Sequence, residues 1–122
     1  MKIAIPSFGP RVSPRFDCAP NVTLFTVENG MVVDRGEVSF EQLNPWQRLE
    51  RLRDLNIQAL ICGGIDGYSQ MVLQTRQIRV IAWVAGEVEE AVKCFLQGEL
   101  KSGLFLYPGC RRKRVRRRSR KI

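Results

Sequence analysis

Cysteine is the side chain in this sequence best suited to chemistry, because the 122 residues include four cysteines and no histidine. The thiols are Cys18, Cys62, Cys94 and Cys110, and none of them forms a Cys-x-x-Cys pair. Zinc-ribbon and thioredoxin-type redox motifs are therefore not supported. The sequence shows no export signal, so we expect free thiols rather than two disulfides.

Cys62 stands where an apolar run meets a glycine-rich segment, which reads Ile-Cys-Gly-Gly-Ile-Asp-Gly from residue 61 to 67. Thiolates suit iron–sulfur and copper centres, and nearby backbone amides can hydrogen-bond to cluster sulfides. The glycine loop, residues 63–67, could form an anion-binding nest before a helix. Two other interpretations stay open: Cys62 packs as a small apolar residue, and the loop is a tight turn capped by Asp66.

The basic tail, residues 111–122, is the second feature that could bind a partner. It holds nine basic residues and no acid, so it accounts for more than the whole formal net charge of +8, and the other 110 residues together are near −1. Its basic residues are Arg111, Arg112, Lys113, Arg114, Arg116, Arg117, Arg118, Arg120 and Lys121. This composition predicts salt-sensitive binding of RNA, DNA or another polyanion, although no interleaved aromatic residue supports base stacking. A solvated tail without a partner is the alternative.

Catalysis finds little support in the residue types. Two-metal hydrolysis needs several carboxylates gathered on the sheet, and the first strand has none. Asp17 and Asp66 are isolated candidates, and histidine, the usual general base, is missing. We therefore expect no enzymatic activity. No apolar stretch approaches the length of a membrane span, and we expect a cytoplasmic protein.

The first forty residues predict a strand, a long loop and a hairpin. A short apolar strand at residues 2–6 should end at its proline. The first loop, residues 7–20, is rich in proline and has no clear periodicity. Asn29-Gly30 joins two apolar runs, 21–28 and 31–40, which is a strong hairpin signal.

The remainder alternates helices and strands. Asn44 as N-cap and Pro45 at the first position begin a helix, on which Trp46, Leu49 and Leu52 recur at helical spacing. Two further strands are expected at 57–62 and 79–84. A second helix is expected at 68–76, with Met71, Val72 and Thr75 on one face. A third helix is expected at 86–100, and its apolar stripe consists of Val88, Ala91, Val92 and Phe95.

This order predicts one α/β domain over residues 1–110, followed by the basic tail. Strands that alternate with helices imply parallel pairing with crossover helices, and the hairpin adds one antiparallel strand. We expect a three-layer α/β/α arrangement around a mixed sheet of five strands. Ligands bind outside the carboxyl ends of strands in such sheets, so the first loop and the glycine loop should lie together at that edge.

Several segments, taken together and in order, carry a family resemblance. They are Met1–Pro6, Val12-Ser13-Pro14-Arg15-Phe16, Ala19-Pro20, Ile61–Gly67 and Val88-Glu89-Glu90-Ala91 through Gly98-Glu99-Leu100. This pattern resembles the dinitrogenase iron–molybdenum cofactor biosynthesis domain, the NifX-like nitrogenase accessory family, over roughly residues 1–105. The resemblance implies a ribonuclease-H-like three-layer fold and a role in holding or carrying metal–sulfur clusters or their precursors.

The resemblance and the thiols together predict a non-catalytic carrier that exchanges an iron–sulfur, iron–molybdenum or other metal–sulfur cluster with cluster-assembly proteins. The expected cofactor-contacting residues are Ser13, Arg15, Phe16, Gly63, Gly64, Ile65, Asp66 and Gly67, and the soft metal ligands are Cys18, Cys62 and Cys110. Family members commonly carry histidine and glycine around the phenylalanine, where this chain has Arg15 and Asp17. The alternatives are a nucleic-acid-binding module acting through the basic tail and an adaptor protein without a ligand.

Overall fold

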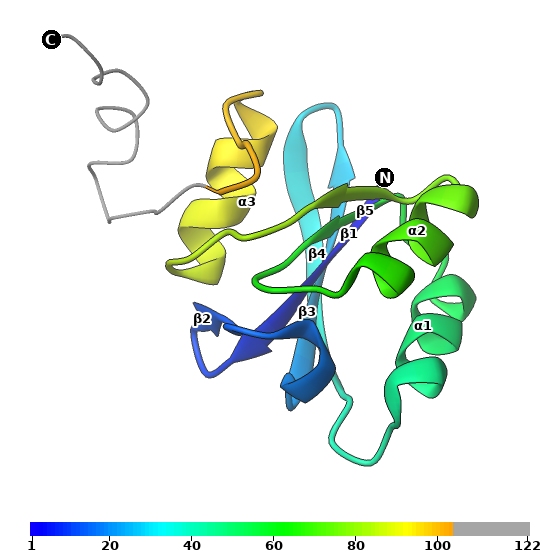
Figure 1. The fold of residues 1–122 in the computed structure, drawn as a ribbon. Helices are drawn as coiled ribbons and strands as arrows, with labels where there is room; N and C mark the ends of the chain where they lie inside the picture. The colour runs from blue at the N-terminus through cyan, green and yellow to red at the C-terminus, as the bar shows by residue number, and fades with distance from the viewer. Residues whose placement is uncertain (104–122) are drawn as a thin grey trace, which may run out of the picture.

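The computed structural model describes residues 1–103, and the basic tail with Cys110 lies outside them (Figure 1). The elements in chain order are β1 (Lys2–Phe8), β2 (Arg11–Val12), a 3-10 turn (Phe16–Cys18), β3 (Asn21–Glu28), β4 (Met31–Ser39), α1 (Pro45–Asp54), β5 (Ala59–Ile61), α2 (Gly67–Thr75), β6 (Arg79–Ile81) and α3 (Val88–Leu96). None of the helices in residues 1–103 is long and apolar enough to cross a membrane.

The strands form one mixed sheet in the order β4-β3-β1-β5-β6, with the short β2 paired to β1. Strands β1, β5 and β6 are parallel, whereas β3 runs antiparallel to both of its neighbours. The predicted five-stranded sheet with one antiparallel strand is thus confirmed for the long path. The structure adds β2 as a sixth strand, because part of the first loop folds back onto β1.

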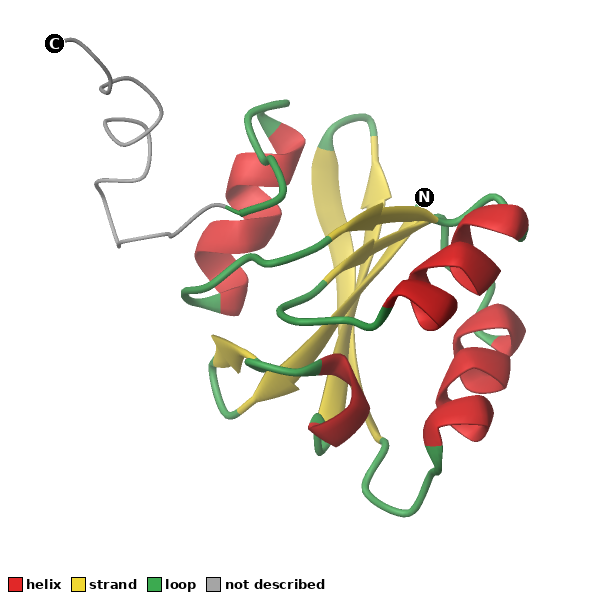
Figure 2. Cartoon of the chain, in the orientation of Figure 1, coloured by secondary structure: helices red, strands yellow, loops and turns green. Residues whose placement is uncertain are grey.

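Helices cover both faces of the sheet, which confirms the three-layer α/β/α prediction (Figures 1 and 2). Along β1, Ile3 and Ile5 face a core that α3 closes with Val88 and Val92. Ala4, between them in sequence, belongs to the second core, which α1 and α2 close. Alternate residues of a strand point to opposite faces, so β1 contributes to both cores. The residues of the second core on α1, β5 and α2 include Leu49, Leu52, Leu60 and Leu73.

The hairpin and the first helix form as their local signals predict. Asn29 and Gly30 have φ values of 55° and 77°, the left-handed conformation that a two-residue type I′ turn requires. At the start of α1 the Asn44 side chain accepts a hydrogen bond from Gln47 N at 2.8 Å, and Asn44 N donates to the Gln47 side chain at 2.9 Å. This reciprocal pair is a capping box.

The prediction that proline ends the first strand was wrong, because β1 continues through Pro6 to Phe8. The Pro6 carbonyl accepts from Ser13 N at 2.9 Å, on the side of the strand away from β3. In an extended residue the N–H and C=O groups point to the same side, so the missing N–H does not break the β1–β3 ladder. The pairing of β1 with β5 ends at Ala4↔Leu60, two residues before Pro6, so the proline breaks no hydrogen bond of that ladder either.

Three helix side chains predicted to lie on the apolar helix faces are exposed instead, namely Trp46, Met71 and Thr75. Trp46 is 51% exposed, and the Arg76 guanidinium lies 5.7 Å from the centre of its ring. Met71 is 53% exposed, whereas Ser69 and Leu73 are buried. Residues four apart share a helix face, and a residue midway between them points away from it. The core stripe of α2 therefore runs through 69 and 73.

Candidate ligand site at the carboxyl edge of the sheet

The first loop and the glycine loop are hydrogen-bonded to each other, as the strand order predicts. Phe16 N donates to Gly64 O at 2.7 Å, and Gly64 N donates to Pro14 O at 2.7 Å. The first loop also binds the connection between β6 and α3, since Val12 N donates to Gly86 O at 2.9 Å. Backbone pairs therefore hold three connections together at the carboxyl ends of β5 and β6.

Gly63 and Gly64 allow this close approach of the two loops because they have no side chain. A Cβ atom on Gly63 would lie 2.3 Å from Ser13 O and 2.6 Å from Pro14 O, so no larger residue fits without separating the loops. A Cβ atom on Gly64 would lie 3.1 Å from the ring of Trp83. The Gly64 amide is already paired within the fold, which removes it from the set of predicted amide donors to a guest.

Asp66 ends the glycine loop as the N-cap of α2, which confirms the tight-turn interpretation. Its carboxylate accepts from Ser69 N at 2.9 Å and from Ser69 Oγ at 2.7 Å. These backbone and side-chain hydrogen bonds lower the pKa of Asp66. The side chain is thus committed to the helix and is not a free base at the edge.

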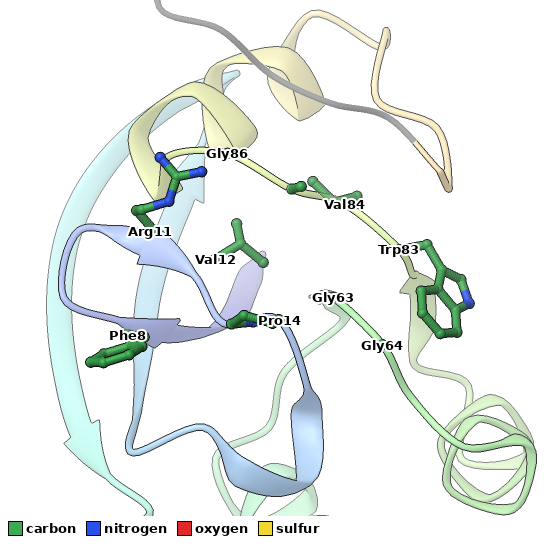
Figure 3. A pocket seen from close by; sticks show the side chains of 10 residues that line it. Phe8, Arg11, Val12, Pro14, Gly63, Gly64, Trp83, Val84 and Gly86 are labelled. Atoms are coloured by element: carbon green, nitrogen blue, oxygen red, sulfur yellow. The ribbon is translucent and has the colours of Figure 1, made fainter.

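A cavity of about 350 Å³ opens beside the loop contact, between the side chains of Phe8 and Trp83 (Figure 3). Both rings are largely exposed, at 66% and 63%. Arg11 is the one charged residue among those that line this cavity. The other lining residues are Val12, Pro14, Gly63, Gly64, Val84, Ala85 and Gly86. We refer to it as the Phe8–Trp83 cavity.

The sequence pattern missed Trp83, which it places inside a buried strand at 79–84. The strand ends at Ile81, and Trp83 has a φ of 61°, a conformation that is costly for a bulky residue. Trp83 N donates to Gly63 O at 2.9 Å, which helps to hold this backbone in place. A short apolar run favours burial, so no local signal marked the residue. For Phe8 the adjoining Gly9-Pro10 turn was an available signal of exposure.

Two further hollows flank the first loop, and Arg15 lines both. The one of about 370 Å³ is lined by Arg15, Asp17, Gly64, Ile65, Asp66 and Trp83. The one of about 520 Å³ is lined by Phe8, Ser13, Pro14, Arg15, Cys18, Pro20 and Glu41. The fold thus gathers most of the predicted cofactor-contacting residues at this edge.

The predicted residues of the first loop take different positions there. Arg15 is exposed and forms an ion pair with Asp17 at 2.8 Å. The hydrogen bond from Arg15 lowers the pKa of Asp17. Phe16 and Ser13 are only 2% and 3% exposed, so they shape the loop from within. The Ser13 hydroxyl donates to Arg15 O at 3.0 Å, which braces the turn that presents the arginine.

The predicted thiol ligands differ in accessibility. Cys18 is exposed, whereas Cys62 is fully buried in the core beneath the edge and lines none of the three hollows. Burial raises the pKa of Cys62 to about 12. Its environment fits the alternative interpretation, a small apolar residue at a strand end. Within residues 1–103 no group of three or more cysteine, aspartate or glutamate side chains is placed to hold a metal ion.

Thiol labelling should separate these cysteines. In a Cys110→Ser background at about pH 8, we expect Cys18 to react at once and Cys62 only after denaturant is added, because a buried thiol with a raised pKa forms little thiolate. Burial raises the pKa of Cys62 from 9.0 to about 12, so its contribution to stability is present below pH 9 and is lost as the pH rises toward 12. Rapid labelling of Cys62 in the folded protein would contradict this placement.

Comparison with solved structures supports the same fold. The crystal structure of PH0822 matches with a TM-score of 0.78 and 21% identity, covering 84% of this chain and 94% of that one. A provisionally assigned dinitrogenase from Methanocaldococcus jannaschii matches with a TM-score of 0.71 and 18% identity, covering 83% and 92%. A provisionally assigned NifB protein from Thermotoga matches with a TM-score of 0.63 and 25% identity, covering 88% and 98%. No curated protein matches the sequence.

The family comparison covers the segments on which the sequence resemblance rests, except for Glu99 and Leu100 at the end of the last one. The model of the family described as "Dinitrogenase iron-molybdenum cofactor" matches residues 1–98, which include the first loop, the glycine loop and α3. The matched region therefore contains the whole edge at which the three hollows lie. The chain belongs to the dinitrogenase iron–molybdenum cofactor family.

Proposed function

We propose that this protein is a non-catalytic carrier of a metal–sulfur cluster or an iron–molybdenum cofactor precursor. The family suggests a part in the biosynthesis or binding of that cofactor and contact with the components that assemble it. The observation that carries the proposal is the arrangement at the carboxyl edge of the sheet. There the first loop and the glycine loop are hydrogen-bonded to each other, beside hollows lined by Arg15 and the exposed Cys18.

The donor set favours a cargo that brings most of its own ligands. The described residues offer one exposed thiol, Cys18, and no complete group of metal-ligating side chains. A bare ion would be held weakly by a single thiolate, whereas a preformed cluster already carries sulfides and needs an anchor and a positive surrounding. Arg15, exposed on the same loop, would supply that positive charge by exchanging its contact with the Asp17 carboxylate for one with the cluster. One anchor also suits release to an acceptor protein.

The acidic residues at this edge support a role without turnover. Asp17 is held by Arg15, and Asp66 caps α2 through two hydrogen bonds, so Glu41 is the one acidic residue lining the three hollows whose carboxylate is not engaged in either way. Strand β1 contributes no carboxylate. Metal-dependent hydrolysis at this edge would need several carboxylates gathered to hold the ions. We accordingly propose binding and transfer as the activity, in the cytoplasmic location expected from the sequence.

Anaerobic reconstitution with iron, sulfide and molybdate tests the proposal. We expect the wild-type protein to retain metal after gel filtration and to show sulfur-to-metal absorption, and Cys18→Ala to lose most of both. Cys62→Ala is the matched control, because that thiol is buried and should not contribute. A Cys110→Ser arm covers the thiol outside the described residues. Equal loading of the wild type and Cys18→Ala, or no loading of either, would refute the carrier proposal as stated.

A further inference from the structure

Strand β4 forms an open edge of the sheet. It pairs with β3 on one side only, and eight of its nine residues are exposed (Figure 1). The strand at the opposite edge, β6, has three residues, and Ser102 and Gly103 are hydrogen-bonded to Ala82 directly after it. A long strand with unpaired backbone groups is a template for another strand. No residue of β4 lines the Phe8–Trp83 cavity or the other two hollows, so the carrier site does not account for this edge.

The backbone groups of Arg35, Glu37 and Ser39 point away from β3. Phe40 N donates to Pro20 O at 2.8 Å, so this pair and every second pair from it along the regular ladder are the hydrogen-bonded ones. Residues of the intervening pairs direct their N–H and C=O groups outward. The ladder is regular over this part of β4, because its bulge lies nearer the hairpin turn. Three consecutive outward positions are therefore available to a partner strand.

The charges along this edge are complementary to a second copy of themselves. Arg35 and Glu37 flank Gly36 and share one face of the sheet. It is the face that α3 covers, because Arg35 forms an ion pair with Glu89 of that helix. Two antiparallel copies of β4 centred on Gly36 would place Arg35 of each copy directly opposite Glu37 of the other. Opposite charges in directly opposed positions stabilise a strand pair, whereas like charges destabilise it.

The same charges disfavour the two neighbouring registers. A two-fold axis perpendicular to the sheet places the central residue opposite itself. A centre at Arg35 would thus oppose two arginines, and a centre at Glu37 would oppose two glutamates. With the centre at Gly36, the outward backbone groups of Arg35 also meet those of Glu37, so backbone and side chains pair in one register. Charged residues on an edge strand commonly block association, but this arrangement selects a single way to associate.

We propose that β4 pairs with β4 of a second copy of this chain, antiparallel and centred on Gly36, to form a two-fold dimer with a continuous sheet. Arg35 can keep Glu89 and also bind Glu37 of the second copy, because a guanidinium has five N–H donors. The pairing also lays the exposed apolar run at 31–33 beside the far end of the partner strand. Exposed apolar residues gathered in this way are typical of interaction surfaces.

Sedimentation velocity of the full-length chain tests the dimer. In about 0.15 M salt, which screens the net charge of +8, we expect the wild type to shift from monomer to dimer between about 10 μM and 1 mM. Arg35→Glu and Glu37→Arg should each weaken self-association about tenfold or more, because each substitution opposes like charges twice. Arg51→Glu is the matched control, since it makes the same change of charge at an exposed position on α1 and should dimerise as the wild type does.

Mixing the two charge variants separates this register from any other. An equimolar mixture of Arg35→Glu and Glu37→Arg again places an arginine opposite a glutamate at both positions. We therefore expect dimers in the mixture at concentrations where neither variant dimerises alone. Such rescue also shows that both variants are folded, whatever the loss of the contact between Arg35 and Glu89 costs.

Proline at position 37 tests the backbone pairing separately. Glu37→Pro removes an N–H that points away from β3, so the variant should fold and remain monomeric. Glu37→Gln, which keeps that N–H and loses only the charge, should retain most of the self-association. The proposal is overturned if the wild type sediments as a monomer throughout, if the mixture behaves as its two separate components do, or if Glu37→Pro dimerises as the wild type does.

This inference is independent of the carrier proposal. A two-fold axis perpendicular to the sheet turns the carboxyl edges of the two copies in opposite directions and leaves each edge open to its own ligand. Cluster loading is measured on cysteine variants and self-association on β4 variants, and neither set removes a residue that the other experiment requires. Failure of one proposal therefore leaves the result for the other interpretable.

Discussion

Replacing Gly63 with alanine is expected to lower the free energy of unfolding by about 3 kcal/mol. The added Cβ atom would lie 2.3 Å from Ser13 O, 2.6 Å from Pro14 O and 2.8 Å from Pro14 C, all of them backbone atoms. Backbone cannot rotate away as a flexible side chain can, so the first loop must move as a unit. That movement would break the hydrogen bonds between Gly64 and its partners in the first loop.

Urea denaturation measures this effect, with Gly67→Ala as the matched control. Gly67 is the first residue of α2, and nothing lies within 4 Å of the position its Cβ would take. Alanine there should leave stability unchanged or raise it by up to about 1 kcal/mol. If Gly63→Ala and Gly67→Ala unfold at the same urea concentration, the close contact between the two loops is not a feature of the folded protein.

Replacing Arg48 with methionine should destabilise the protein by a similar amount, about 3 kcal/mol. Arg48 is only 5% exposed, and its guanidinium donates to Ala19 O at 2.6 Å and to Leu43 O at 3.1 Å. It also lies 5.8 Å from the centre of the Phe40 ring. Burial lowers the pKa of Arg48, but an arginine stays charged at neutral pH and keeps donating. Methionine would fill much of the volume and leave these carbonyls without their donor.

The comparison for this prediction is Arg51→Met, an exposed arginine on the same helix, which should change stability by less than about 0.5 kcal/mol. A second readout is the labelling rate of Cys18, because Arg48 holds the carbonyl of Ala19 immediately after it. We expect Cys18 to be labelled faster in Arg48→Met than in Arg51→Met at a denaturant concentration where both variants remain folded. Equal stability of the two variants would show that the buried arginine does not hold the first loop.

Much of the architecture was predictable because its signals are local. Asn29-Gly30 requires only two residues to adopt left-handed backbone, and the N-cap Asn44 with Pro45 acts within one helical turn. The alternation of strands and helices after residue 44 then limits the sheet to parallel pairing there. The same reasoning placed the first loop and the glycine loop at one edge, and their hydrogen bonds confirm it.

The sequence by itself therefore determined the element order, the hairpin, the three layers, the family and the edge at which the loops meet. Only the tertiary structure decided that Cys62 is buried, that Arg48 holds the first loop from inside, and that Trp83 stands exposed beside the end of the described chain. The reason is physical: a turn or a cap depends on neighbours within four residues, whereas burial of a side chain depends on what the sheet brings against it. Residues 13 and 63, or 82 and 103, meet only once the strands are paired.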